Sequence, residues 1–154
     1  MDQLTFGVFT IAFQKQNVIL AKNLVGYQFG KGFQAVENED ELSNYNEGDK
    51  QVPFFVADEC LGKDLIGLRY EQLLPFVQPN DGDAFKIIGG DFVTTEDGTG
   101  IVHIAPSFGA DDFRVAKQNG MGNLTLVDRR GRFLPEVQDG TFLFGEEFVK
   151  EAYY

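Results

Sequence analysis

Side chains that could take part in chemistry gather between residues 97 and 120, where the sequence reads DGTGIVHIAPSFGADDFRVAKQNG. The pattern predicts a strand, a glycine-containing loop and the start of a helix. His103, the only histidine of the chain, stands on the predicted strand, and Asp111 and Asp112 stand in the first turn of the predicted helix. A carboxylate at such a junction suits the ammonium group of a ligand, whereas free N–H groups suit an oxyanion or a phosphate. The segment therefore indicates a site for a small polar group.

The same residues also have a purely structural interpretation. Either Asp111 or Asp112 would serve as the N-cap of the helix, which stabilises a helix by about 1 kcal/mol without any ligand. His103 would then be a buried histidine bonded to a backbone carbonyl, and the glycines would serve only the turns. Spacing does not separate the two interpretations, and the pattern alone favours the structural one.

The elements that must position this segment are mainly β-strands. Runs of β-branched and aromatic residues predict strands at 4–13, 18–21, 53–57 and 124–128, with the clearest β region at 84–106. Helices are expected at 22–29, 110–120 and 145–154, and the middle one is bounded by two acids at its start and by Gly120 at its end. A solvated loop or frayed helix is expected at 37–50, which is acidic, and a turn followed by a strand at 59–76.

Length and composition predict one β-rich domain over residues 1–154. Hydrophobic residues make up 43% of the 154 positions, and 16 Phe and 18 Gly are typical of strands and turns. The net charge is −11, from 13 basic and 24 acidic side chains. This balance argues against a protein that grips nucleic acid by its own electrostatics, although it allows one that receives the end of a strand from another module.

The sequence has too few cysteines and histidines for internal disulfides or for the usual zinc sites. With Cys60 alone, no internal disulfide is possible, and with one His and one Cys we expect no metal site of the usual zinc type. Cys60 lies outside the 97–120 segment and is expected to be a small core residue. The sequence has no signal peptide and no apolar run near the ~20 residues of a membrane span, so we expect a cytoplasmic protein without a membrane partner.

The 97–120 segment resembles the signature of the editing domain inserted in isoleucyl-tRNA synthetases, roughly GTGxVHxAPxxGxDDY followed by a glycine. Eleven positions between Gly98 and Gly120 fall on this pattern, and Phe113 replaces the commoner Tyr. The runs GKDLIGLRYEQLLPF and GDFVTTEDG, at 62–76 and 90–98, are also similar to the family. Valyl enzymes tend to carry Lys and leucyl enzymes Met at the position of His103, so the resemblance favours the isoleucyl enzymes.

The resemblance implies a mainly β fold with a few helices, arranged as a closed or nearly closed β-barrel. It implies a fragment of a class I aminoacyl-tRNA synthetase that hydrolyses the ester of valine mischarged onto tRNA(Ile). The partners would be the 3′ end of that tRNA and the rest of the parent synthetase, and the chain is expected to be a monomer. No cofactor is expected for editing, because ATP serves only the synthetic domain of the parent enzyme.

By the same resemblance, Asp112 would bind the α-ammonium group of the misattached amino acid, and His103 would orient the substrate or the attacking water. We expect both to act in catalysis, with Asp111 as a cap or a support. The remaining residues expected to line the substrate site are Gly100, Ile104, Ala105 and Phe108.

The sequence departs from the family pattern in two ways. Phe108 stands where many members carry His, and Ile104 stands where Thr is common, so fewer polar groups would surround the ester. A threonine-rich segment that the family uses in this pocket does not occur in the sequence. A second hypothesis is therefore a binding-only module for the tRNA end, inactive alone; a third is a generic β-rich domain that binds small molecules.

Overall fold

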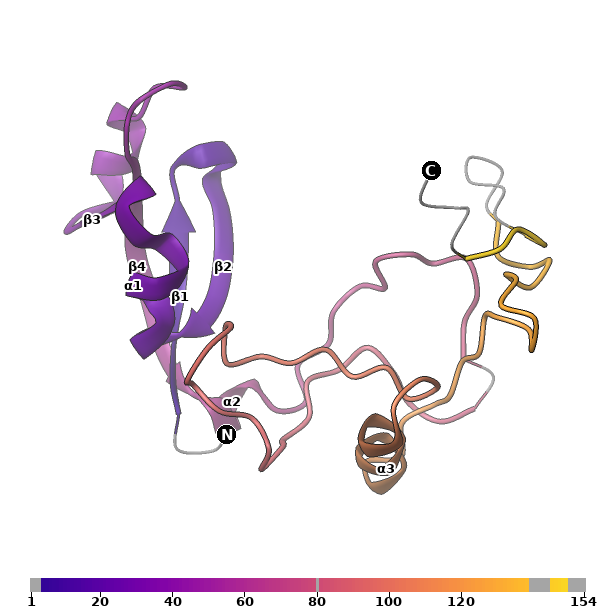
Figure 1. Ribbon diagram of the computed structural model, residues 1–154. Helices are drawn as coiled ribbons and strands as arrows, with labels where there is room; N and C mark the ends of the chain where they lie inside the picture. Colours follow the sequence, from indigo (N-terminus) through magenta and orange to yellow (C-terminus); the bar gives the residue numbers. More distant parts are fainter. Residues whose placement is uncertain (1–3, 80, 139–144, 150–154) are drawn as a thin grey trace. The chain divides into compact units, whose positions relative to one another are not determined.

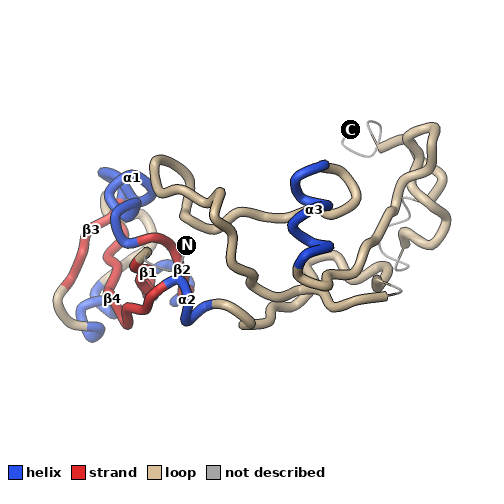
Figure 2. The backbone as a smooth tube through the Cα atoms, turned by 90° about the horizontal axis from the view of Figure 1, so that it is seen from below, coloured by secondary structure: helices blue, strands red, loops and turns tan. Residues whose placement is uncertain are grey.

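The computed structural model describes residues 4–79, 81–138 and 145–149 (Figure 1). The chain divides into two compact units, each formed by two segments of sequence. The first unit comprises Met1–Gly67 and Ile87–His103, and the second comprises Leu68–Lys86 and Ile104–Tyr154. Figure 2 shows that the strands belong to the first unit and that loops make up most of the second.

The first unit is built on a four-stranded sheet in the order β2-β1-β4-β3. Its strands are β1 at Thr5–Ile11, β2 at Gln16–Ala21, β3 at Phe33–Val36 and β4 at Val52–Leu61. β1 pairs antiparallel with both β2 and β4, and β3 pairs parallel with β4. Because β2 and β3 are edge strands, the sheet is open. The expected closed or nearly closed β-barrel is therefore wrong, and the described fold is mixed α/β.

Both faces of this sheet are covered. Side chains alternate along a strand, so Phe6 and Phe9 of β1 point to opposite faces, and both are almost fully buried. On the Phe9 side, helix α1 at Val25–Phe29 contributes Phe29. The centre of its ring lies 5.7 Å from that of Phe9 and 4.6 Å from that of Phe54. Each edge-to-face pair of this kind stabilises the folded state by about 0.5–1.5 kcal/mol, in addition to the free energy gained by burying the two rings. The aromatic cluster thus explains why α1 lies on the sheet despite its shortness.

Local sequence patterns predicted three of the four strands of the first unit and missed β3. The strands expected at 4–13, 18–21 and 53–57 are confirmed as β1, β2 and β4, and the helix expected at 22–29 forms as a short 3₁₀ turn followed by α1. The exposed acidic stretch 37–50 contains a 3₁₀ turn at Glu39–Asn44. Residues 62–65 form the single helical turn α2, Gly62–Leu65, where a turn was expected. The strand expected after this turn is wrong, because residues 66–76 contain only an isolated bridge at Arg69.

The strands expected at 84–106 and 124–128 do not form. The structure shows only isolated bridges there, Arg69 with Lys86 and Val127 with Phe133. β-propensity measures how well a side chain fits a half-buried pleated surface, and no neighbouring strand supplies that surface to these segments. The helix expected at 145–154 is also not seen where it can be checked: residues 145–149 form turns and a bridge, and 150–154 lie outside the described residues.

Cys60 is partly buried and packs against the core of the first unit, as expected from its small size. Burial raises the pKa of its thiol, and the nearby carboxylates of Asp64 and Asp58 raise it further. In the described part of the chain, no helix is long and apolar enough to cross a bilayer.

Helix α3, Ala110–Gln118, confirms the helix expected at 110–120 and is the main regular element described in the second unit. It buries Val115 and Ala116. The helix ends in a Schellman motif: Met121 N–H donates to the Ala116 carbonyl at 2.9 Å, and Gly120 N–H donates to that of Lys117 at 3.3 Å. Gly120 takes the positive φ of +63° that this motif requires.

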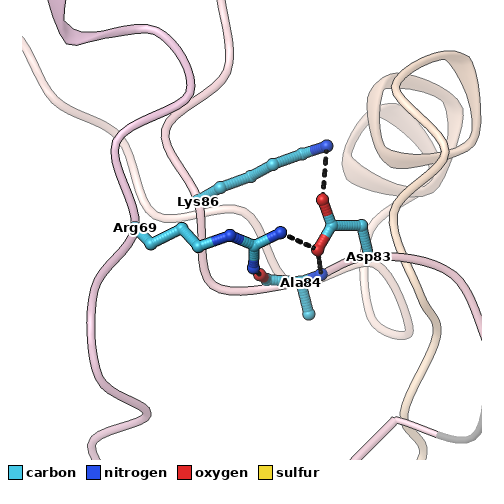
Figure 3. A network of polar contacts seen from close by, with 4 residues as sticks. All are labelled: Arg69, Asp83, Ala84 and Lys86. Carbon is cyan, nitrogen blue, oxygen red and sulfur yellow. Dashed lines mark hydrogen bonds and ion pairs between the residues drawn. The ribbon is translucent and has the colours of Figure 1, made fainter.

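Asp83 connects the end of α3 to the segment 69–86, and Figure 3 shows its carboxylate joined to the side chains of Arg69 and Lys86. Its carboxylate accepts from Arg69 at 2.6 Å and lies 2.9 Å from Lys86 Nζ. Its backbone donates to Gly120 O at 3.0 Å and accepts from Gly122 N at 2.5 Å. These contacts tie together parts of the second unit that have little regular structure of their own.

The first prediction concerns the acid stability of this network. The hydrogen bond with Lys86, followed by that with Arg69, lowers the pKa of Asp83 from 3.8 to about 2. A carboxyl with a lowered folded-state pKa contributes stability above its unfolded value of 3.8, and that contribution is lost as the pH falls toward 2. Asp83→Asn should therefore lower the melting temperature at neutral pH and flatten its decrease over this acid range.

Thermal unfolding followed by circular dichroism across that pH range checks this expectation. Asp81→Asn is the matched control, because it removes an exposed neighbouring carboxylate that forms no ion pair among the described residues. If Asp83→Asn retained the acid dependence of the unsubstituted chain, the lowered pKa of Asp83 would have no part in stability.

Candidate functional site

The candidate segment begins with a loop that is anchored to the core of the first unit. Thr99 O accepts from Ala21 N at 2.8 Å at the end of β2, and Gln28 Nε2 donates to Gly98 O at 2.5 Å. Gly100 is buried with a φ of +77°, and a Cβ there would lie 2.7 Å from Ala21 Cβ and 3.2 Å from the Phe6 ring. Close packing of the loop against the core therefore explains why a glycine stands at position 100.

The side chains that follow Gly100 along the loop are exposed. Val102 is 52% exposed, and His103 is exposed as well. The prediction that His103 is buried and bonded to a carbonyl is wrong, because no hydrogen bond or ion pair joins it to another described residue. The imidazole is thus available to a ligand, and its role stays a prediction.

His103 is the last residue of the first unit, whereas Ile104, Ala105 and Asp112 belong to the second. Ile104 and Ala105 are partly buried, and Phe108 is 68% exposed. The structure brings Ala105 and Asp112 together within the second unit. Their contact is a hydrogen bond between a side chain and the backbone.

Asp112 bonds to the loop that precedes its own helix. Its Oδ2 accepts from the backbone N–H of Ala105 at 3.1 Å, seven residues earlier. Asp112 is partly buried in the first turn of α3, where the helix dipole favours a negative charge. Oδ2 is committed to the backbone, whereas Oδ1 accepts no hydrogen bond from the described residues. The carboxylate is thus oriented and retains the capacity to bind a cationic group.

Asp111 has different surroundings, although it is the adjacent residue. Its side chain is 89% exposed and forms an ion pair with Arg114 at 2.9 Å, one turn along α3. Such exposed pairs contribute about 0.3–0.5 kcal/mol. Neither aspartate caps the helix, because the N-cap is Gly109 and no side chain bonds there. The capping interpretation of the two acids is therefore wrong.

Gly109 is a residue of the site that sequence reasoning did not single out for a role. A Cβ at this position would lie 3.2 Å from both Cγ and Oδ2 of Asp112. Since the φ of Gly109 is −133°, a larger residue here would press on the Asp112 carboxylate without straining the backbone. The signal in the sequence was a glycine three residues before the second of two acids, which is compatible with an ordinary helix start.

The loop between Ala105 and α3 is also fixed at Ser107. Its Oγ lies 2.5 Å from both Leu124 O and Asn123 Oδ1, and it donates its single proton to one of them at a time. Ser107 was not among the predicted site residues. It joins the loop to the segment after α3 and so limits the positions that Phe108 and Asp112 can take.

Other possible sites do not involve these residues. A hollow of about 420 Å³ in the first unit is lined mostly by polar residues near β3 and the 3₁₀ turn at Glu39–Asn44, and none of the predicted site residues lines it. Among the described residues, no group of three or more His, Cys, Asp or Glu side chains is placed to hold a metal ion.

Comparisons with known proteins relate the chain to one group of enzymes. No profile of a known protein family matches it. An isoleucine–tRNA ligase of Cytophaga hutchinsonii is 49% identical over 159 aligned positions, which cover 97% of this chain and 13% of the ligase. A ligase of the same name from Bacteroides fragilis is 48% identical over 90% of this chain and 12% of its own length. One from Thermoplasma acidophilum is 47% identical over 59% of this chain and 8% of its own length.

The second prediction tests the anchor of the candidate loop. Gly100→Ala places an L-residue at positive φ, which costs about 1–2 kcal/mol, and forces a methyl group against the core, which costs about 1–3 kcal/mol more. Gly98→Ala is the matched control, because its φ is +69° and a Cβ there meets no atom within 4 Å.

Urea unfolding of the two variants separates these contributions. We expect both to be less stable than the unsubstituted chain, with Gly100→Ala the less stable of the two. Equal destabilisation by both substitutions would show that Gly100 is needed for its φ alone and that the contact with Ala21 is not tight.

Proposed function

This chain is homologous to one short segment of the isoleucine–tRNA ligases, and from that premise we propose that the segment hydrolyses valine wrongly attached to tRNA(Ile). The relatives are several times longer, since the chain spans only 13% of the Cytophaga enzyme, so the activity of the whole ligase is not assigned to it. The observation that carries the proposal is the oriented carboxylate of Asp112 within a sequence that matches these ligases.

The physical need for such an activity follows from the size of the two amino acids. Valine is smaller than isoleucine by one methylene, and a pocket shaped for isoleucine gains only about 1–3 kcal/mol by filling that space; isoleucine–tRNA ligases are a well-known example. Synthesis alone therefore leaves a fraction of the tRNA carrying valine. A second pocket that admits valine and excludes isoleucine corrects the error by cleaving the ester.

In this proposal Asp112 binds the α-ammonium group of the valyl ester. Oδ2 is held by the Ala105 N–H, so Oδ1 presents the negative charge in a fixed direction. A charge-assisted hydrogen bond of this kind contributes about 1.5–3 kcal/mol. Water then attacks the ester carbonyl carbon, the bond to the ribose oxygen breaks, and the ribose oxygen takes up a proton. The products are free valine and tRNA.

The other residues of the segment receive positioning roles. His103 is exposed and without a described partner, so its imidazole can orient the substrate or the attacking water. Ile104, Ala105 and the exposed ring of Phe108 supply apolar surface for the valine side chain. Gly100 contributes through the anchor of the loop. We expect the hydrolysis to need no cofactor, and ATP to serve only the synthetic reaction of the ligase.

The third prediction uses the two neighbouring aspartates as a matched pair. Asp112→Asn keeps an oxygen that can accept from Ala105 N–H but removes the charge that binds the ammonium group. We expect kcat/KM for Val-tRNA(Ile) deacylation to fall about 10-fold to about 100-fold. Asp111→Asn removes only an exposed ion pair and should leave deacylation within about twofold of the unsubstituted chain.

The measurement is release of labelled valine from Val-tRNA(Ile) by the 154-residue chain, compared with the spontaneous rate. Retained activity in Asp112→Asn would contradict the role assigned to this carboxylate. Release no faster than the spontaneous rate, together with measurable binding of the charged tRNA, would instead favour the binding-only module. Uncharged tRNA(Ile) competes in either case and serves as the control for binding.

A further inference from the structure

A second cluster of charged groups lies in the second unit, at the tip of a hairpin that we call the arginine hairpin, residues 127–133 (orange in Figure 1). Val127 and Phe133 form its antiparallel bridge. The sequence between them is DRRGR, so three of the 13 basic residues of the chain stand within four positions. No role in the proposed hydrolysis uses these arginines.

The backbone of the arginine hairpin is held by the carboxylate at its start. Asp128 Oδ1 accepts from the backbone N–H groups of Arg130 and Arg132 at 2.8 and 2.9 Å. Asp128 N–H also donates to Arg132 O at 2.8 Å, and Gly131, with a φ of +80°, closes the turn. The bond from the Arg132 backbone is the main cause that lowers the pKa of Asp128. The tip is therefore ordered before any partner binds.

The Asp128 carboxylate is directed to the backbone, so it forms no ion pair with the arginine head groups and acts on those of Arg130 and Arg132 only at longer range. Arg129 and Arg130 are both exposed, and neither forms an ion pair within residues 4–79, 81–138 and 145–149. By contrast, Arg69 and Arg114 each pair with an aspartate. In a chain that carries 24 acidic residues, two adjacent unpaired guanidinium groups are a local exception to the charge balance.

Arg132 adds a third cation whose position is fixed. Its guanidinium carbon lies 4.5 Å from the centre of the Phe148 ring, a cation–π contact. Its Nε is buried and has no hydrogen-bond acceptor in the described structure. Among the described residues no carboxylate forms an ion pair with this guanidinium group.

We propose that the arginine hairpin binds phosphate groups of the RNA backbone, and that it is the point at which this acidic chain holds tRNA. Planar guanidinium groups match phosphate oxygens in pairs, and contacts to phosphates provide most of the sequence-independent affinity for RNA. The −11 net charge does not prevent this, because exposed charges more than about 8 Å from a phosphate are largely screened at physiological salt. The choice of tRNA as the RNA rests on the proposed function.

The fourth prediction removes the two exposed cations together. Binding of labelled, uncharged tRNA(Ile) to the 154-residue chain is measured by fluorescence anisotropy over a series of KCl concentrations. Arg129→Gln/Arg130→Gln should weaken binding at low salt and reduce the slope of log K against log[KCl] by roughly 1.5–2, as expected for two lost phosphate contacts. Both side chains are exposed, so the fold should remain intact, and circular dichroism checks this.

Lys31→Gln/Lys50→Gln is the charge-matched control, because it removes two exposed cations of the first unit that also lack ion pairs among the described residues. We expect its slope to equal that of the unsubstituted chain. An equal fall in slope for both double variants would overturn the proposal by showing that any two cations contribute alike. Unchanged tRNA binding in the arginine variant, with lost binding to the rest of the ligase, would assign the hairpin to a protein partner and also overturn it.

Val-tRNA(Ile) deacylation at saturating tRNA separates this inference from the proposed function. The arginine variant should then release valine at the rate of the unsubstituted chain, because the hairpin contributes binding and no catalytic group. If no variant releases valine but the salt slope falls as expected, the proposed hydrolysis fails and the phosphate contact stands. If the arginine variant releases valine normally and its salt slope equals that of the unsubstituted chain, the proposal for the arginine hairpin fails and the proposed hydrolysis stands.

Discussion

The contacts of Asp83 hold the second unit together, because most of the rest of that unit is loop. Its backbone bonds to the residues that end α3, and its carboxylate bonds to Arg69 and Lys86 on the segment that enters the unit. The backbone next to Asp83 packs closely against the segment after α3, since a Cβ on Gly82 would lie 2.6 Å from Gly122 N. Asp112 stands at the opposite end of α3, so the helix that carries the proposed ammonium-binding carboxylate is held by Asp83 about two turns away from it.

The fold could be predicted from sequence where a local pattern determines an element. The helix α3 was predicted because two acids at its start and Gly120 at its end mark its limits, and β1, β2 and β4 were predicted from short apolar runs. The strands predicted at 84–106 were wrong, because the same residue types form loops there. The closed barrel that the family resemblance implied was also wrong. Strand pairing is a property of segments far apart in the chain, so a β-prone run does not show which neighbour, if any, it will have.

The candidate site was predictable as a segment but not as an arrangement. By spacing alone, Asp111 and Asp112 are two equivalent acids at a helix start, and only the family resemblance distinguished them. In the structure they differ, because consecutive helical residues point in different directions: one is bonded to the preceding loop and the other to Arg114. Gly109 and Ser107 were overlooked because small residues in a loop are common for many reasons. Their contacts with Asp112 and with residues 123–124 are visible only in three dimensions.

The packing of Gly100 against Ala21 and Phe6 has a consequence for how sequences of this kind can diverge. A side chain larger than alanine at position 21 would fill the space that the backbone of the loop now occupies, even though position 21 lies in a strand far from the loop in sequence. Positions 21 and 100 therefore form a coupled pair in which bulk on either side displaces His103, three residues further on. Grafting a different loop onto this sheet would succeed only where both partners of that pair stay small.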